Sequence, residues 1–410
     1  MAVSVEPFSR TEGCRRPPWV LVSAGFHERG GQSKANAALA DHLLARGTAV
    51  HLVGHDFDPR FLGRPGCTVH AVARPLRSDF LGVLGLRRRG REVARQVSRG
   101  WPGARVVVNG GCCAWGDINW VHYVHAAWRS APPGLPLRHR LKEGIAGAVF
   151  RSQERQALAA AGLVLANSEQ TRRLLIDRLG LAPRKVRTLY LGGEEAWRPA
   201  TAAERAAARS WLGQGERRPL VLFLGGLGND ERKGFDTLWS AWRELCGDPR
   251  WDADLVVAGG GSAADRWAAR VAAAGLTGRV RLLGFVDRVS DLLAAADVLV
   301  SPVRYEPYGL NVQEAVCRGV PALVSARAGV VEQFPPDLAD MVLPDPDDAR
   351  DLGARLRRWR ADADGWRRRF APLGAALRAR GWDAMAAEIV ELAEADARPP
   401  AGAVREGVAP

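Results

Sequence analysis

Short apolar runs alternate with longer amphipathic runs along the chain, which is the pattern of parallel sheets covered by helices. The first half contains five apolar runs that predict strands, at residues 19–22, 49–53, 105–108, 121–125 and 163–166. Amphipathic periodicity between these runs predicts helices at residues 34–46, 87–98, 141–160 and 169–179. The first half therefore predicts a sheet wound with helices.

The second half repeats this alternation without repeating the sequence. Its apolar runs predict strands at residues 220–224, 254–258, 280–283, 297–300 and 321–325. Helices are predicted at residues 234–246, 263–274, 290–296 and 310–318, and from residue 343 to about residue 395. Two doubly wound sheets in succession indicate an α/β protein of two Rossmann-like domains, which also suits a length of 410 residues.

Breaks in the alternation predict the domain limits. We expect the first domain at residues 18–198 and the second to begin at residue 219. Residues 199–218 hold Pro199, an Ala/Arg-rich stretch and several turn formers, so they predict the linker. The charged residues 1–17 lack an apolar core and predict a disordered leader, and the Pro-, Gly- and Ala-rich residues 397–410 predict a disordered tail.

Composition narrows the class of protein. Hydrophobic residues make up 47% and charged residues 25%, as in a soluble globular protein, and we find no apolar run of the roughly 18 residues that a membrane span needs. The six cysteines form no C-x-x-C pair and predict reduced thiols in a cytoplasmic protein. The net charge of +13 indicates an acidic partner, which charge alone leaves open between a nucleotide diphosphate, an anionic lipid surface and nucleic acid.

Open α/β sheets bind ligands beyond the carboxyl ends of their strands, so the loops after the strands are the candidate site. After the first strand, Gly30 and Gly31 permit close backbone approach ahead of a helix N-terminus, although a flexible loop is the alternative. His125 ends a predicted strand and faces the cleft, with a buried structural histidine as an equal alternative. His122 lies three residues earlier and faces the other way, which favours the structural interpretation.

The second domain offers two loops with more chemistry. After its first strand, Arg232 and Lys233 place cations where a diphosphate would lie, with a solvated helix start as the alternative. Only four of the 58 Lys and Arg residues are lysines, so Lys233 stands out. After a later strand, the carboxylates of Glu306 and Glu314 can accept hydrogen bonds from sugar and ribose hydroxyls. An ordinary turn with solvated carboxylates is the alternative there.

Together these segments resemble the retaining glycosyltransferases of glycosyltransferase family 4, which have the GT-B architecture. The resemblance covers roughly residues 18–392 and is most specific in the spacing Glu306-x7-Glu314. The other matching segments are Gly319-Val-Pro321, Ala328-Gly329, Glu332, Asn167-Ser168-Glu169, Lys233-Gly234, Val257-Ala-Gly-Gly-Gly261 and Leu283-Gly-Phe-Val286. GT-B implies two Rossmann-like doubly wound domains that face an interdomain cleft. It also implies a second domain at residues 219–378 and a final helix at residues 379–396 that crosses back onto the first domain.

The resemblance also implies an activity and a set of roles. The family transfers a sugar from a nucleotide-diphosphate sugar with retention of anomeric configuration, without a metal or another cofactor. The catalytic residues implied are Glu306 at the donor sugar, Lys233 at the leaving diphosphate and His125 near the reacting centre. The substrate-binding residues implied are Gly30, Gly31, Arg232, Gly284, Phe285, Val286, Gly309, Leu310, Asn311 and Glu314. The expected partners are a nucleotide sugar and an acceptor glycan, lipid or small molecule, with no nucleic acid.

One departure from the family pattern keeps other functions open. The family usually has an Arg shortly before the lysine, whereas Gly225 is followed here by Gly226 and Leu227, which leaves Arg232 as the substitute cation. The alternatives are a GT-B sugar-nucleotide epimerase and a catalytically inactive binding protein with this fold. The basic residues 81–105 and 138–155 suggest a peripheral contact with anionic lipid at the inner face of a membrane, with solvated arginine-rich helices as the alternative.

Overall fold

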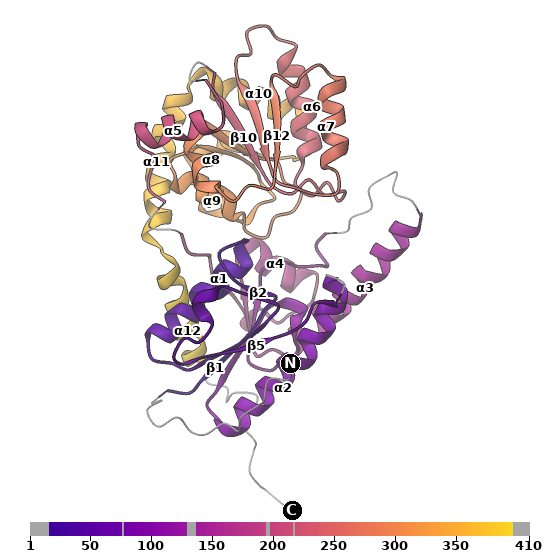
Figure 1. Cartoon of the computed structure of the whole chain (residues 1–410), viewed down its shortest axis with the longest axis vertical. Coiled ribbons are helices and arrows are strands. Elements are labelled where there is room, and N and C mark those ends of the chain that lie inside the picture. Colours follow the sequence, from indigo (N-terminus) through magenta and orange to yellow (C-terminus); the bar gives the residue numbers. More distant parts are fainter. Residues whose placement is uncertain (1–15, 76–77, 129–136, 194–196, 216–217, 397–410) are drawn as a thin grey trace, which may run out of the picture.

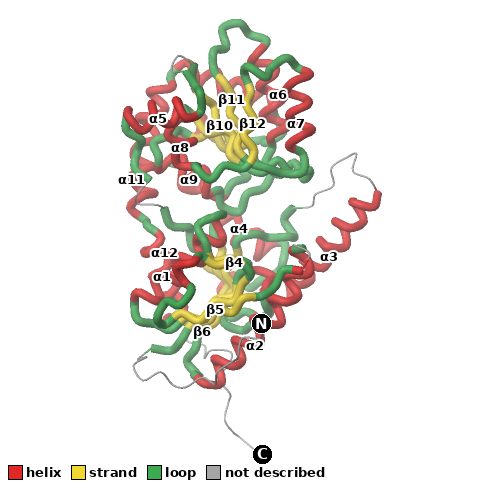
Figure 2. Tube along the Cα trace, in the orientation of Figure 1, coloured by secondary structure: helices red, strands yellow, loops and turns green. Residues whose placement is uncertain are grey.

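The computed structural model describes residues 16–75, 78–128, 137–193, 197–215 and 218–396. They form two α/β units stacked along the long axis of the molecule, the N-terminal unit in indigo and purple and the C-terminal unit mainly in orange (Figure 1). In each unit the strands form a central layer with helices around it (Figure 2). The predicted tail, and residues 1–15 of the predicted leader, lie outside the described residues.

The N-terminal unit is built on a parallel sheet of seven strands. They are β1 (Trp19–Val22), β3 (Val50–Gly54), β5 (Cys67–Ala71), β6 (Arg105–Val108), β7 (Ile118–Val121), β8 (Leu163–Ala166) and β9 (Val186–Thr188). Their order across the sheet is β5-β3-β1-β6-β7-β8-β9. Strands β1, β3, β7 and β8 are buried along their whole length, which explains why their sequences are mainly apolar. The short strands β2 (Gly25–Phe26) and β4 (Asp56–Phe57) pair separately.

Within the described residues, four helices and three 3-10 turns accompany the sheet of the N-terminal unit. They are α1 (Gly31–Ala45), α2 (Asp79–Gly100), α3 (Leu137–Ala160), α4 (Glu169–Asp177), η1 (Pro59–Phe61), η3 (Gly110–Cys112) and η4 (Pro183–Lys185). Local sequence sets where helix α4 begins, because the Ser168 hydroxyl accepts a hydrogen bond from the Thr171 N–H at 3.0 Å. Helix α1 starts differently: Gly30 precedes it with a φ of 82°, a conformation that favours glycine.

The C-terminal unit has a parallel sheet of six strands. They are β10 (Leu220–Leu224), β11 (Asp254–Ala258), β12 (Val280–Gly284), β13 (Val298–Ser301), β14 (Ala322–Ser325) and β15 (Val342–Leu343). Their order is β12-β11-β10-β13-β14-β15, so the chain winds outward in both directions from the neighbours β10 and β13. The loops that follow two such strands run in opposite directions, and this opens a crevice at the carboxyl ends of the strands. Lys233 lies in the loop after β10 and Glu306 in the loop after β13.

Helices cover this second sheet and tie it to the first unit. They are α6 (Phe235–Cys246), α7 (Ala264–Ala273), α8 (Val289–Ala295), α9 (Leu310–Cys317), α10 (Ala349–Ala361) and α11 (Ala363–Ala379), with the 3-10 turns η5 (Gly329–Gln333) and η6 (Pro336–Met341). The last helix, α12 (Trp382–Ala395), leaves the C-terminal unit and packs beside α1 (Figure 1). Among the described residues, no helix combines the length and apolar character needed to cross a bilayer.

The segment expected as a linker contains a helix, α5 (Ala202–Trp211). Thr201 and Glu204 form a reciprocal capping box at its start, a local signal that was present in the sequence. The helix packs on α8 of the C-terminal unit. Arg209, which is 2% exposed, holds it there through Asp297 at 3.3 Å.

The predicted strand at residues 121–125 is wrong, because β7 ends at Val121. Beyond that point two backbone N–H groups are bonded to side chains instead of a neighbouring strand. The N–H of Val124 donates to the Tyr305 hydroxyl at 3.1 Å, and the N–H of His125 donates to Glu154 at 2.9 Å. Strands β5, β9 and β15 were not predicted; β5 and β9 are partly exposed, and β15 has only two residues.

Candidate active site

A cavity of about 860 Å³ lies between the two units, at the carboxyl ends of both sheets. The N-terminal unit lines it with residues that follow β1 and β7, including Gly30, Gly31, Gln32, Lys34, His122 and Tyr123. The C-terminal unit contributes Gly225, Lys233, Gly259, Phe285, Val286, Glu306, Gly309, Leu310, Asn311 and Glu314. Three residues predicted for the site, Arg232, Gly284 and His125, are not on the cavity wall.

Lys233 and Glu306 meet in this cavity from the loops after β10 and β13. Their ammonium and carboxylate groups form an ion pair. Gly234, which follows the lysine, has a φ of 69°, and a Cβ there would overlap the carbonyl of Pro302. Only glycine therefore lets the lysine loop lie against the chain that leads into the Glu306 loop.

Arg232 lies next to Glu306 but not on the cavity wall. Its Nη1 donates to the Tyr305 carbonyl at 3.0 Å and lies 3.5 Å from Oε2 of Glu306. Burial alone would raise the pKa of the Glu306 carboxyl, but the positive charges of Lys233 and Arg232 outweigh burial, and its pKa is lowered. Glu306 is therefore an anionic hydrogen-bond acceptor at neutral pH.

Glu314 is paired across the domain boundary with Lys34. The ammonium of Lys34, on α1, lies 3.6 Å from a carboxylate oxygen of Glu314, on α9. It also lies over the rings of Trp197 and Trp382, 5.3 and 5.8 Å from their centroids. Sequence reasoning missed Lys34, although the scarcity of lysine that drew attention to Lys233 applies equally to it.

The N-terminus of α9 opens onto the same cavity. Gly309 precedes the helix with a φ of 107°, and Asn311 fixes the first turn by donating to the Leu224 carbonyl at 2.8 Å. The domains meet closely here, since a Cβ on Gly31 would lie 3.2 Å from the Leu310 side chain. Free N–H groups at a helix N-terminus favour an anion such as a phosphate.

Glycines and one exposed aromatic ring form the outer part of the cavity. A Cβ on Gly259 would lie 2.0 Å from the Gly225 carbonyl, so the loops after β10 and β11 touch through bare backbone. Phe285 is 71% exposed, an unusual position for a large apolar ring, and it lines the cavity together with Val286. Gly284 lies in β12 just behind them and has a φ of 67°.

The histidines are arranged differently from the prediction. His122 lines the cavity, whereas His125 lies beyond β7 with its Nδ1 3.1 Å from a carboxylate oxygen of Glu154. The ring of His122 packs on Trp120, with centroids 4.4 Å apart. Burial lowers the pKa of His122 to about 3, so its imidazole is neutral at physiological pH. The difference follows from the strand end, because β7 ends at Val121 and not at His125.

Comparisons with known proteins agree with this architecture. A family model described as Glycosyltransferase Family 4 matches residues 29–193, and one described as Glycosyl transferases group 1 matches residues 218–362. The D-inositol 3-phosphate glycosyltransferase of Geodermatophilus obscurus is 28% identical over 368 residues, covering 82% of this chain and 79% of that protein. Alignments with other curated relatives span only 33% to 59% of those proteins' own lengths.

Solved structures share the fold. The sucrose-phosphate synthase of Thermosynechococcus elongatus superposes with a TM-score of 0.72 at 23% identity, over 92% of this chain and 98% of that one. Anabaena HepE, in complex with UDP and glucose, superposes with a TM-score of 0.66 at 16% identity, over 93% and 100% of the two chains. The predicted fold class, two Rossmann-like domains that face an interdomain cleft, is confirmed. The chain belongs to the GT-B glycosyltransferases, with a glycosyltransferase family 4 region followed by a glycosyl transferases group 1 region.

Proposed function

We propose that this glycosyltransferase moves a sugar from a nucleotide-diphosphate sugar to an acceptor with retention of anomeric configuration and without a metal. The observation that carries the proposal is the convergence of Lys233, Glu306 and the N-terminus of α9 on one interdomain cavity. A cation and a helix N-terminus suit a diphosphate, and an anionic carboxylate suits sugar hydroxyls. A single donor molecule would use all three groups at once.

The ion pairs of the cavity suggest how the donor enters. In this structure the ammonium of Lys233 neutralises the Glu306 carboxylate, and the ammonium of Lys34 neutralises the Glu314 carboxylate. Lys233 would turn to the diphosphate and leave Glu306 to accept from the sugar hydroxyls, while Glu314 would exchange Lys34 for the ribose. As the bond between the sugar and the diphosphate breaks, negative charge grows on the phosphate oxygens, where Lys233 and the α9 amides stabilise it.

The outer part of the cavity suits the base of the donor nucleotide. Exposed Phe285 offers a ring face for stacking, and the glycine-lined floor permits close approach of the ligand to backbone. The structural neighbour HepE holds UDP and glucose, so a uridine-diphosphate sugar is the first donor to test. A panel of UDP-, GDP- and ADP-sugars, scored by the rise in melting temperature, identifies the base.

The test of the function is sugar transfer by the variants Lys233→Ala and Glu306→Gln, with Arg243→Ala as a matched control. Arg243 is an exposed cation on α6, the helix that follows Lys233, and it is not on the cavity wall. Both cavity variants should lose transfer while the control keeps it, and near-normal turnover in either would contradict the assignment. A new glycoside as product supports transfer. A free epimerised sugar would indicate an epimerase, and absence of turnover would indicate a binding protein.

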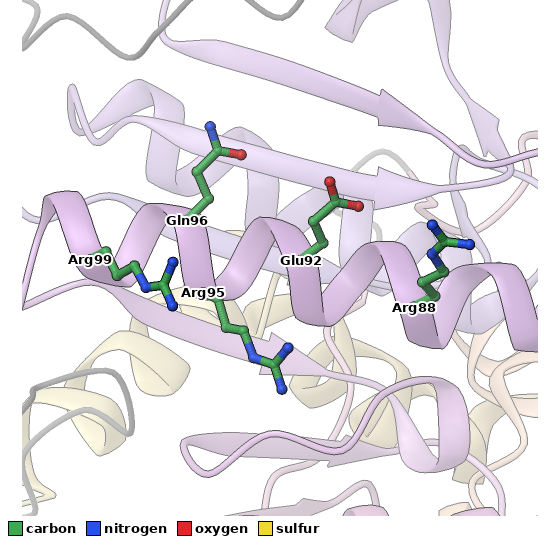
Figure 3. Close-up of a pocket in the computed structure, with 5 residues that line it drawn as sticks. All are labelled: Arg88, Glu92, Arg95, Gln96 and Arg99. Atoms are coloured by element: carbon green, nitrogen blue, oxygen red, sulfur yellow. The ribbon is translucent and has the colours of Figure 1, made fainter.

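We also propose a peripheral contact with anionic lipid at the cytoplasmic face of a membrane, through one face of α2. Arg88, Arg95 and Arg99 project from that helix near Glu92 and Gln96 (Figure 3). Leu81 and Leu84 continue the same helix toward its start and are 38% and 48% exposed. Arginines beside exposed leucines at helical spacing suit a lipid headgroup surface.

A further inference from the structure

A second cavity lies outside the interdomain cleft, where α5, α8, α9 and α11 of the C-terminal unit meet. We call it the arginine cavity, because its wall includes the four arginines Arg205, Arg318, Arg367 and Arg378. Its volume is about 140 Å³, about ten times the roughly 10–15 Å³ that a single water molecule requires. Buried apolar side chains such as Leu293 and Val316 form its inner surface.

Few carboxylates balance these arginines. Among the described residues, Asp297 is shared by Arg205 at 2.7 Å, Arg209 at 3.3 Å and Arg367 at 3.2 Å. Glu204 is the other acid, and it bonds both terminal nitrogens of Arg198, at 3.1 and 3.2 Å. Its nearest approach to Arg318 is 3.6 Å. Positive charge is therefore in excess around the arginine cavity.

Arg318 is the one member of the four that is buried. It is 6% exposed and its Nε is buried without a hydrogen-bond partner among the described residues. Its Nη1 donates to the Arg198 carbonyl at 3.0 Å, and its Nη2 forms an ion pair with Glu204 at 3.6 Å, without a hydrogen bond. A buried guanidinium normally has a paired and hydrogen-bonded anion, because removing the charge from water is costly. The unsatisfied Nε of Arg318, and a carboxylate that it shares with Arg198, therefore leave it able to bind a further acidic partner.

The remaining arginines have donors to offer such a partner. Counting only partners in the described part of the chain, Arg378 makes one hydrogen bond, from Nη1 to the Cys317 carbonyl at 2.7 Å, and Arg367 makes one, to Asp297. A guanidinium carries five N–H donors arranged in a fork that matches phosphate oxygens. We propose that the arginine cavity binds a small phosphate-class anion, separately from the donor site. Helix α9 reaches both places, with Leu310 at the donor cavity and Val316 at the arginine cavity.

The test is a titration of the full chain with inorganic phosphate, followed by the melting temperature and by calorimetry. It is performed in the Lys233→Ala background, because a phosphate ion would also be attracted to Lys233. Sodium chloride at matched ionic strength corrects for screening. We expect a saturable rise in melting temperature in this background, and a loss of phosphate affinity of at least about tenfold on adding Arg378→Gln or Arg367→Gln, the equivalent of one lost charge-assisted contact.

Arg368→Gln is the matched control, since Arg368 is exposed on the same helix, α11, and is not on the wall of the arginine cavity. It removes the same charge and should leave the phosphate affinity unchanged. If Arg378→Gln fails to fold, Arg367→Gln still decides the question, because the Arg367 side chain is 41% exposed. Absence of saturable binding in the Lys233→Ala protein, or equal loss in all three arginine variants, would overturn the proposal. Because the readout is binding, it does not depend on sugar transfer.

Discussion

The hydroxyl of Tyr305 accepts a hydrogen bond from the backbone N–H of Val124 at 3.1 Å, although the two residues belong to different domains. Tyr305 is 5% exposed and packs in a hydrophobic cluster formed by residues of β7, β8 and α4 in the N-terminal unit. On the other side of Glu306, the Ser168 hydroxyl donates to the Pro307 carbonyl at 2.6 Å. The N-terminal unit thus holds the chain on both sides of Glu306.

Replacing Tyr305 should therefore affect both stability and turnover. Tyr305→Phe keeps the packing but leaves the buried Val124 N–H without its partner, which should cost about 1–3 kcal/mol. Tyr305→Ala also empties part of the cluster and should cost about 3–5 kcal/mol. A displaced Glu306 should lower kcat by up to about 100-fold. Denaturant unfolding and steady-state kinetics measure the two effects, and a normal kcat in Tyr305→Ala would show that this contact does not position Glu306.

The two cations near Glu306, Lys233 and Arg232, should contribute unequally to kcat. Lys233 is on the cavity wall, whereas Arg232 lies behind Glu306 and bonds the Tyr305 carbonyl. Lys233→Met should lower kcat by about 100- to 1,000-fold, as expected for loss of one group that stabilises developing charge. Arg232→Gln should have a smaller effect on kcat, because its charge acts through Glu306. Parallel kinetics with a saturating donor compare the two, and an Arg232 effect equal to that of Lys233 would place Arg232 on the diphosphate.

Acid should destabilise the protein through His122. Burial holds its folded-state pKa at about 3, below the ordinary value of 6.5, so the unfolded chain binds the extra proton between those two values. The stability that His122 contributes is complete above about pH 6.5 and is lost as the pH falls toward 3. Wild-type stability should therefore fall more steeply than that of His122→Phe over this range.

Urea unfolding at pH 7, 6, 5 and 4 checks this prediction. His51 and His70, each with a pKa lowered to about 4 by burial, should add the same slope to both proteins. The informative quantity is thus the difference between wild type and variant. A difference that stays constant with pH would exclude His122 as a source of acid sensitivity.

The exposed face of α2 should bind anionic vesicles. Replacing Arg88, Arg95 and Arg99 with Gln should weaken cosedimentation with phosphatidylserine vesicles, at about 1 kcal/mol for each arginine near the surface. Added salt should weaken binding of the wild type as well. The exposed arginines Arg358 and Arg368, replaced with Gln in the C-terminal unit, serve as the control. Wild-type binding that does not depend on the anionic lipid content would rule out this contact.

The sequence by itself determined most of the elements and several polar side chains of the interdomain cavity. Strand β10 and strand β11 have the predicted limits, because strands buried on both faces read as unbroken apolar runs. Lys233, Glu306 and Glu314 were identified by type and by position after a strand, and the sheet topology gathers them in one cavity. The sequence was sufficient to predict an element wherever the residues of that segment alone decide its conformation.

Tertiary structure decided which side chains complete the site. It placed His122 on the cavity wall in place of His125, because the Tyr305 hydroxyl and the Glu154 carboxylate bind backbone N–H groups that a longer β7 would have used. It also brought Lys34 to Glu314, 280 residues away along the chain. Such contacts depend on how two domains pack, and no periodicity or spacing within one segment encodes them.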